Sequence, residues 1–386
     1  MTTDNPTTDD PFADIRPYNN AEAPEVFARL GADPELVDSL ARLRLPRLLR
    51  WAPPLARSLV RRWLAGQVAS LKTVEDLQLS IVKPELEKVI AKTTTFTTSG
   101  LEKLDAASSW LFISNHRDIV MDPALANYAL HRAGHRTLSI AIGNNLLQKP
   151  WVADLMRLNK SFIVRRDVQG PRELLAASRQ LSAYIRHMIS DDVGPVWLAQ
   201  REGRAKDGRD ATEPAVIKML SLSRDKRTES VGETLAALKI VPLAISYEVD
   251  PCDTLKAAEL AAGPDYRKRP FEDVASIGKG ISGYKGCVHL AFGEPIVDPD
   301  LDVDGVVAAI DQQISTLYAL FPTNLWAWEM LHGEAPPASL PVRLGVVQRH
   351  TFEERIRECP ESLRPWLLAM YANPVDTALA HRPEVL

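Results

Sequence analysis

The sequence predicts an α/β protein whose mixed, largely parallel sheet is flanked by helices, with helical extensions at both ends. Between about residues 91 and 300, short apolar runs alternate with longer helical stretches, a pattern typical of an α/β domain with a buried sheet. Before and after this segment the chain contains helical patterns without strand-like runs. The 386 residues, 45% hydrophobic and 25% charged, have an ordinary globular composition with enough apolar side chains for a large core.

The predicted strands are apolar runs of limited length, and the predicted helices fill several of the intervals between them. The strands are expected at residues 110–114, 138–143, 161–165, 193–200, 238–248 and 287–296. The clearest helices are expected at residues 123–133 and 172–190. The stretch GKGISGYKG, residues 278–286, is expected to be a loop before the last strand.

Changes in composition divide the chain into four segments. Residues 1–20 are rich in Thr, Asp, Asn and Pro, and they are expected to be disordered. Residues 21–90 are predicted as a helical, basic segment, residues 91–300 as the α/β domain, and residues 301–386 as a helical C-terminal extension.

The segment 41–66, ARLRLPRLLRWAPPLARSLVRRWLAG, is strongly basic. It contains seven arginines, and no acidic residue occurs between Asp38 and Glu75. Leucine and tryptophan side chains alternate with these arginines, a composition that suits the headgroup layer of an anionic membrane. The alternative is a helical hairpin packed on the main domain with its arginines in solvent, and the prolines within the segment weaken a single amphipathic helix.

Several function classes are disfavoured. The net charge of −4 does not indicate a nucleic-acid-binding protein, and Cys252, Cys287 and Cys359 form neither a CxxC pair nor a disulfide framework. No HExxH motif or Cys/His cluster suggests a metal, and no GxSxG motif suggests a nucleophilic serine. The polar N-terminus is unlike a signal peptide and no run of about 18 apolar residues occurs, so a cytoplasmic protein without a transmembrane helix is expected.

The stretch SNHRDIVMDP, residues 114–123, carries the first candidate catalytic pair. Asn115 and His116 follow an apolar strand, and the carboxyl ends of strands are where α/β folds bind ligands. An acid on one ring nitrogen would make His116 a general base, and Asp122 lies six residues later. Asp122 before Pro123 is also a typical helix N-cap, which alone would explain that acid.

Three further stretches contain candidate site residues, and two of them are polar clusters that follow predicted strands. Arg165 and Arg166 end one strand, and the second cluster consists of Glu202, Gly203, Arg204 and Lys206. The third feature is Pro242, within an otherwise apolar strand. If the strands are parallel, these residues lie at one edge of the sheet with His116, where guanidinium groups suit a phosphate-bearing substrate. The alternative is that these arginines pair with neighbouring acids in solvent.

These blocks, NH with a following Asp, FIVRR, EGR and VP, occur in an order that resembles the glycerol-phosphate and lysophosphatidic acid acyltransferase superfamily. The stretches GNNLLQKPWVADLMRLNKSFIVRR and FGEPI are also similar to that superfamily, and the resemblance covers about residues 95–300. Two features differ from the family pattern. Asp122 lies one residue further from the His than usual, with Asp118 where the family often has Ser. The usual Phe-Pro-Glu-Gly reads Gln200-Arg201-Glu202-Gly203.

The resemblance implies an O-acyltransferase of phospholipid biosynthesis that needs no cofactor. His116 would be the general base, oriented by Asp122 or, as the alternative, Asp118, and Pro242 would be structural or shape the acyl pocket. Arg165, Arg166, Arg204 and Lys206 would bind the substrate phosphate, with Glu202 and Gly203 shaping that site. The donor would be acyl-CoA or acyl carrier protein, and the acceptor lysophosphatidic acid or glycerol 3-phosphate.

Two alternatives remain open at this stage: acylation of another lysolipid, and a non-catalytic membrane-associated scaffold with the same fold. Retention of His116, Asp122, Arg165 and the Glu-Gly-Arg triplet together argues against the scaffold. Because long acyl chains partition into bilayers, the enzyme is expected to be peripheral on the cytoplasmic face of an anionic membrane, bound through residues 41–66.

Overall fold

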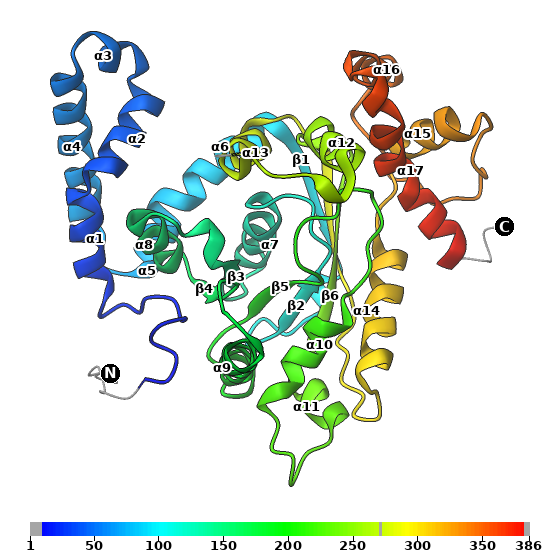
Figure 1. Cartoon of the computed structure of the whole chain (residues 1–386), viewed down its shortest axis with the longest axis horizontal. Helices are drawn as coiled ribbons and strands as arrows, with labels where there is room; N and C mark the ends of the chain where they lie inside the picture. The colour runs from blue at the N-terminus through cyan, green and yellow to red at the C-terminus, as the bar shows by residue number, and fades with distance from the viewer. Residues whose placement is uncertain (1–9, 270–271, 382–386) are drawn as a thin grey trace. The chain divides into compact units, whose positions relative to one another are not determined.

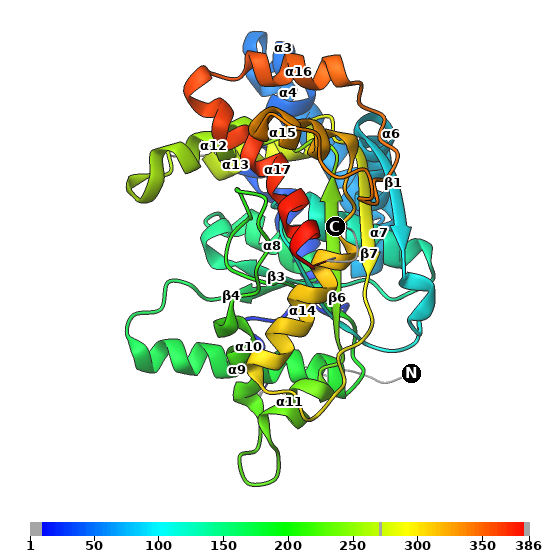
Figure 2. The same ribbon diagram turned by 90° about the vertical axis from the view of Figure 1, so that its right-hand side faces the viewer.

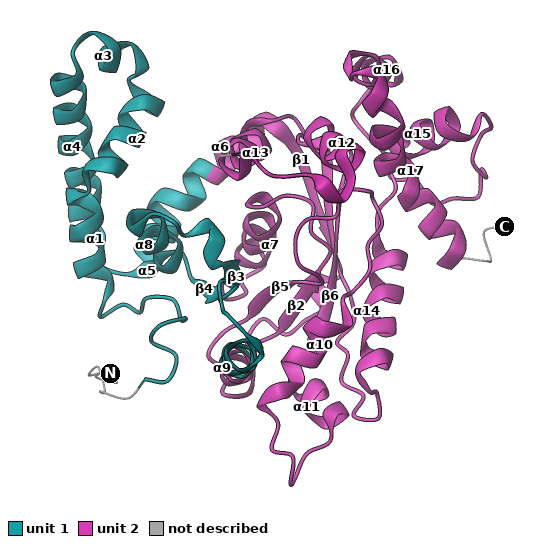
Figure 3. Ribbon diagram, viewed as in Figure 1, with its two compact units in different colours: residues 1–85, 139–181 teal, residues 86–138, 182–386 magenta. Residues whose placement is uncertain are grey.

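The computed structural model describes residues 10–269 and 272–381. The chain divides into two compact units (Figure 3). The first contains residues 1–85 and 139–181, and the second contains residues 86–138 and 182–386. No helix among the described residues is long and apolar enough to cross a membrane.

A seven-stranded sheet is the central feature of the fold (Figure 1). Its strand order is β1-β7-β6-β2-β5-β3-β4. The strands are β1 (Thr94–Ser99), β2 (Leu111–Ser114), β3 (Ser139–Gly143), β4 (Ser161–Val164), β5 (Val196–Ala199), β6 (Ile240–Tyr247) and β7 (Gly286–Phe292). The pairs β1–β7, β2–β5, β2–β6 and β3–β4 are parallel, and β6–β7 is antiparallel. The mixed, largely parallel sheet predicted from the sequence is therefore confirmed.

Strand β1, with the sequence TTFTTS, was not predicted. Its side chains alternate between half-buried and exposed over most of its length, so it lacks the apolar run of a buried strand. It pairs with β7 at the end of the strand order, where one side of a strand remains unpaired. β-branched threonine suits such a half-buried position, which explains how a polar sequence forms this strand.

The second unit contains helices that pack on its strands or on one another. They are α7 (Met121–Arg132), α10 (Pro214–Leu220), α11 (Val231–Ala237), α12 (Asp253–Ala262), α13 (Glu272–Ser282), α14 (Val303–Leu317), α15 (Pro322–His332), α16 (Arg349–Glu358) and α17 (Arg364–His381). Helix α14 packs against β6, and α15 packs against α17 (Figure 2). The predicted helical C-terminal region is confirmed. The loop expected at residues 278–286 was wrong in its first half, because α13 extends to Ser282.

The first unit has its own apolar core. Its helices are α1 (Ala23–Ala32), α2 (Pro34–Arg44), α3 (Pro46–Trp51), α4 (Pro53–Ala69), α5 (Val74–Leu77) and α8 (Pro150–Leu158). Prolines begin α2, α3 and α4, positions at which the missing N–H costs no helical hydrogen bond. Two helices, α6 (Lys83–Thr93) and α9 (Pro171–Ser190), continue across the division between the units, and a π-helical turn (Gln78–Val82) precedes α6 within the first unit.

The expectation of disorder at residues 1–20 falls partly on residues 1–9, which lie outside the described residues. Residues 10–20 instead form turns within the first unit. Ile15 is 2% exposed, and its carbonyl accepts a hydrogen bond from the backbone of Ile163 in β4. The polar composition of residues 10–20 gave no indication that Ile15 would be buried.

Buried His289 in β7 is expected to make stability depend on pH. Its ring nitrogens lie 2.8 Å from the Thr97 hydroxyl and 3.0 Å from the Ser99 hydroxyl, and burial lowers its pKa from 6.5 to about 4. The unfolded chain therefore takes up this proton first. The neutral, buried His289 ring makes its full contribution to the free energy of unfolding above pH 6.5. This contribution is lost as the pH falls toward 4, by about 3 kcal/mol in total. Between pH 7 and pH 5, urea unfolding should show the wild type losing about 2 kcal/mol more than His289→Gln. Equal losses in the two proteins would contradict this.

Candidate active site

Asn115 holds the start of the loop that follows β2. Its side-chain oxygen accepts from the backbone N–H of Ile245 at 2.7 Å, and its side-chain nitrogen donates to the Ile245 carbonyl at 3.0 Å. The amide thus extends the hydrogen bonding between β2 and β6 by one residue. Because Asn115 is fully buried, this pair of bonds fixes the direction in which the chain leaves the sheet.

His116 and Asp122 form the hydrogen-bonded pair that the sequence suggested. The distance from His116 Nδ1 to Asp122 Oδ2 is 2.8 Å, and the Asp122 side chain has no exposed surface. The same oxygen accepts from the backbone N–H groups of Arg117 at 2.5 Å and Asp118 at 2.9 Å. Because a carboxylate only accepts, His116 donates through Nδ1, and in the neutral ring this arrangement leaves the lone pair on Nε2.

The sequence offered Asp122 as the N-cap of the helix that follows His116, but the structure gives Asp118 and Asp122 other roles at the start of this helix. Helix α7 begins at Met121, and it is Asp118 that accepts from the backbone of Val120 at 3.0 Å and Met121 at 2.8 Å. The N-cap role expected for Asp122 was therefore wrong, because Val120 has the N-cap position and Asp122 is the second residue of α7. Asp118, the alternative orienting acid, makes no hydrogen bond with the imidazole among the contacts described. Burial and the nearby Asp122 raise the pKa of Asp118.

Tyr247, the last residue of β6, is a further hydrogen-bond partner of Asp122 that the sequence did not predict. Its hydroxyl donates to Asp122 Oδ1 at 2.7 Å, so the two carboxylate oxygens serve different partners. Burial raises the pKa of Tyr247 well above its usual value, and the Asp122 charge adds to this. The phenol therefore stays protonated and remains a donor.

Trp197 in β5 contacts the His116 ring from the side. The ring centroids are 5.5 Å apart with an interplanar angle of 69°, an edge-to-face arrangement. The indole N–H donates to the Ser114 hydroxyl at 3.0 Å, which fixes the tryptophan. The His116 side chain is 14% exposed, so this packing leaves part of the imidazole accessible.

The loop after β5 lies directly beside the His116 loop. The backbone N–H of Ala205 donates to the His116 carbonyl at 2.8 Å. Gly203 has a φ of +76°, which favours glycine at this turn, and Glu202 is exposed. The Arg204 atom Nη1 is buried without a hydrogen-bond partner, and the Lys206 ammonium pairs with Glu259. Of the predicted phosphate-binding cations, Arg204 is thus placed near His116 with donor capacity to spare.

Arg165 and Arg166 follow β4 in the first unit. The Arg165 guanidinium pairs there with Asp14, and the Arg166 backbone N–H donates to the Asn144 side chain at 3.0 Å. The guanidinium of Arg166 lies close to Gly143, whose missing Cβ leaves room for it.

Pro242 lies in the interior of β6, buried and opposite Ile113 of β2. Its carbonyl accepts from the Gly293 backbone at 2.8 Å, at the end of the antiparallel pairing with β7. Proline lacks an N–H, so β6 makes one hydrogen bond fewer here, directly before its registered antiparallel pairing with β7 begins at Leu243. This position suits a structural role.

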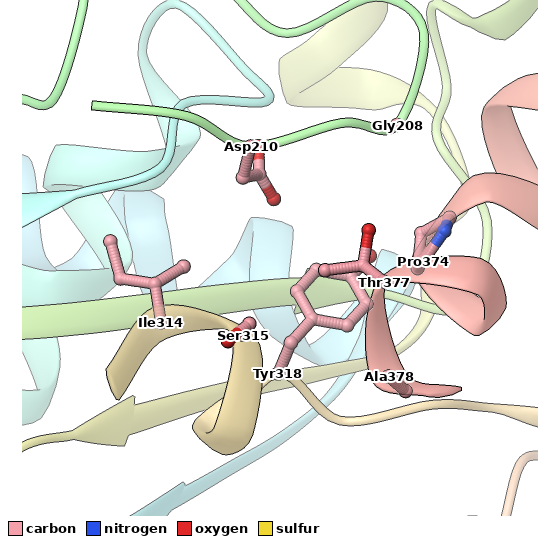
Figure 4. A pocket seen from close by; sticks show the side chains of 8 residues that line it. All are labelled: Gly208, Asp210, Ile314, Ser315, Tyr318, Pro374, Thr377 and Ala378. Carbon is pink, nitrogen blue, oxygen red and sulfur yellow. The ribbon is translucent and has the colours of Figure 1, made fainter. Parts of the chain in front are cut away.

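A buried ion pair lies behind the His116 loop. Arg117 Nη2 donates to Asp210 Oδ2 at 2.7 Å, and Asn115 donates to the same oxygen at 3.0 Å. Asp210 lines a cavity of about 10 Å³ between its loop and helices α14 and α17 (Figure 4). Burial raises the pKa of Asp210, although the Arg117 charge opposes that shift.

Comparison with known proteins gives a family match for the part of the chain that contains this site. Residues 95–213 match the model of the Acyltransferase family. A search of curated proteins found no match. A similar solved structure is the crystal structure of the 1-acyl-sn-glycerophosphate (LPA) acyltransferase, PlsC, from Thermotoga maritima. It is 15% identical, with a TM-score of 0.33, and the alignment covers 76% of this chain and 95% of that one. Residues 95–213, which contain the His116–Asp122 pair, therefore match an acyltransferase family model, in agreement with the acyltransferase resemblance that the motifs indicated.

Proposed function

We propose that this protein is an O-acyltransferase that moves a fatty acyl group from a thioester to a glycerol phosphate acceptor, either lysophosphatidic acid or glycerol 3-phosphate. The observation that carries the proposal is the His116–Asp122 pair at 2.8 Å, at the end of β2 within an acyltransferase-family domain. Acyl-CoA or acyl carrier protein supplies the acyl group, and the protein needs no other cofactor.

In the proposed reaction, His116 Nε2 takes the proton of the acceptor hydroxyl as its oxygen attacks the thioester carbonyl carbon. A C–O bond forms and the C–S bond breaks, and the proton held by His116 passes to the departing thiolate. The Asp122 carboxylate holds the ring through Nδ1 and stabilises the imidazolium present between the two proton transfers. Products are the acylated acceptor and the free thiol.

Recognition of the acceptor phosphate is assigned to the predicted cations. Arg204 is the best supported, because its Nη1 is buried and without a hydrogen-bond partner, and its loop is bonded to the His116 carbonyl. Gly203 allows the backbone to approach a ligand closely. Arg165, Arg166 and Lys206 are proposed as further phosphate ligands, with exposed Glu202 orienting one of the guanidinium groups.

The test is an acyl-transfer assay on the purified full chain. Radiolabelled acyl-CoA and acyl carrier protein thioesters are offered with glycerol 3-phosphate, lysophosphatidic acid or other lysolipids, each separately. The proposal expects labelled product with one of the two glycerol phosphates. Product with only another lysolipid would replace the acceptor, and no product with any donor and acceptor would favour the scaffold alternative.

We further propose that the basic segment 41–66 binds an anionic membrane on its cytoplasmic face. In the first unit, Leu43 is 77% exposed and Trp51 is 84% exposed, so both large apolar side chains are available to a membrane surface. They lie on α2 and α3 among arginines, of which Arg57 is paired with Asp38. Apolar side chains at the headgroup layer with flanking cations suit peripheral binding.

Replacing Trp51 and Leu43 with serine is expected to weaken vesicle binding by roughly tenfold or more, since each apolar side chain contributes about 1.5–3 kcal/mol when removed from water. Co-sedimentation with phosphatidylglycerol vesicles at low salt measures this. Trp366→Ser is the matched control, because that tryptophan is 43% exposed on α17 in the other unit. Equal binding of the variants and the wild type would contradict the assignment.

A further inference from the structure

The C-terminal helices α15–α17 share a buried core with the segment that follows β6. This core contains Val249 and Ala257 together with Phe352 of α16 and Leu367 and Tyr371 of α17. Helix α17 packs against α12 as well as α15. The C-terminal extension, helices α15–α17, is therefore attached to the part of the domain next to the His116 loop. Two series of hydrogen bonds, called here the first and second path, connect side chains of the extension with residues adjacent to His116.

The first path starts at the Tyr371 hydroxyl. It accepts from the backbone N–H of Asp250 at 3.0 Å and donates to Asp253 Oδ2 at 2.9 Å. Arg355 of α16 donates to the same Asp253 oxygen at 2.5 Å and to the Asp250 carbonyl at 3.1 Å. Two helices of the extension thus fix the turn that begins α12.

Lys256 connects the first path to the loop that contains His116. Its side chain is 1% exposed, and its ammonium pairs with the Asp250 carboxylate and donates to the Arg117 carbonyl at 2.7 Å. Burial alone would raise the pKa of Asp250, but the Lys256 charge brings it below its usual value. Arg117 directly follows His116, so the position of this ammonium bears on the catalytic backbone.

The second path passes through the loop 207–210. Asn373 of α17 donates to the Asp207 carbonyl at 2.6 Å and accepts from Arg209 at 3.2 Å. Gly208 has a φ of +79°, and a Cβ there would lie 2.2 Å from the Met370 carbonyl oxygen, so loop and helix are in close contact. The loop presents Asp210 to Asn115 and Arg117, the neighbours of His116 on both sides.

We propose that the C-terminal extension positions the catalytic loop, with Tyr371 and Asn373 of α17 as positioning residues acting through Lys256 and Asp210. Neither residue touches the imidazole, and each holds a backbone or side chain next to it. Loss of either contact should lower the rate of the chemical step more than it weakens substrate binding. The kinetic part of this inference rests on the proposed function, whereas the structural part does not.

A double-mutant cycle tests the first path. Tyr371→Phe and Lys256→Met are each expected to lower kcat by about 10- to 100-fold with little change in KM, because small displacements of a catalytic group are costly. The double variant should be no slower than the slower single variant, since both changes interrupt one path. Multiplied effects, or an unchanged kcat in Tyr371→Phe, would overturn the proposal.

Thr351→Val is the matched control, since it removes an exposed hydroxyl of α16 that lies 3.3 Å from Nε2 of the neighbouring His350 and belongs to neither path. Its kcat should equal that of the wild type. Tyr371→Phe removes a single oxygen atom, so it decides the question alone if Lys256→Met does not fold. Circular dichroism below the melting temperature confirms that each variant assayed is folded.

A readout independent of acyl transfer separates this inference from the proposed function. Diethyl pyrocarbonate modifies accessible imidazole nitrogens, and peptide mass spectrometry measures its rate at His116 relative to exposed His187 in the same sample. In Tyr371→Phe the relative rate at His116 should rise, because a loosened loop exposes Nε2, and in Thr351→Val it should not. An unchanged rate in Tyr371→Phe would overturn the positioning role, whatever the wild-type protein catalyses.

Discussion

Replacing His116 with alanine is expected to lower kcat for acyl transfer by about 10²–10⁴-fold, the usual contribution of a general base. The variant loses the only group that the described site places to accept the acceptor's proton. The free energy of unfolding should change little, because the side chain is partly exposed and its single hydrogen bond, to Asp122, is local. The measurement compares kcat and KM of both proteins with the acceptor identified in the transfer assay.

His187→Ala is the matched control for this variant. His187 also pairs with a carboxylate, Asp191, at 2.6 Å, but this pair is exposed near the end of α9. If a histidine–aspartate pair mattered only for stability or solubility, both substitutions would have similar effects. Activity lost only in His116→Ala supports the assignment, and His116→Ala retaining half of the wild-type kcat would exclude His116 as the base.

The parts of this site that the sequence predicts are local. Asn115, His116 and Asp122 lie within one short stretch, and the strand that precedes them is a clear apolar run. Helix α7 was expected at residues 123–133 and is found at Met121–Arg132. Periodicity and spacing report contacts of this kind because both partners appear in the same window of the sequence.

The supporting contacts could not be predicted, because their partners are distant in the chain. Tyr247 reaches Asp122 from 125 residues away, Asp210 reaches Arg117 from 93, and Lys256 reaches the Arg117 carbonyl from 139. Each appears in the sequence as an isolated polar residue within or after an apolar stretch. The sequence does indicate that such residues need partners. Tyr247 and Lys256 lie at the end of or shortly after apolar segments expected to be buried, and buried polar groups are normally hydrogen-bonded. The sequence alone does not identify which residues those partners are.

Replacing Asp122 with asparagine should separate orientation of the imidazole from its electrostatic stabilisation. Asp122 Oδ2 accepts three N–H donors and Oδ1 accepts the Tyr247 hydroxyl. An asparagine can place its oxygen toward the three donors and its nitrogen toward Tyr247, whose hydroxyl can then accept instead of donate. The loop and the tautomer of His116 are therefore retained, and only the negative charge is lost. We expect kcat to fall by about 10²-fold or more with KM and the melting temperature nearly unchanged.

Alanine at the same position has a different expected outcome, and the contrast tests the assignment of both oxygens. Asp122→Ala leaves the Arg117 and Asp118 N–H groups and the Tyr247 hydroxyl without their acceptor, at a position where the Asp122 side chain has no exposed surface. Each unsatisfied buried donor costs about 1–3 kcal/mol, so this variant should unfold at markedly lower denaturant concentration than Asp122→Asn. If the two variants were equally stable, the carboxylate would not organise the loop. If Asp122→Asn kept the wild-type kcat, its charge would not assist catalysis, and Asp118 would have to be tested as the acid acting on His116.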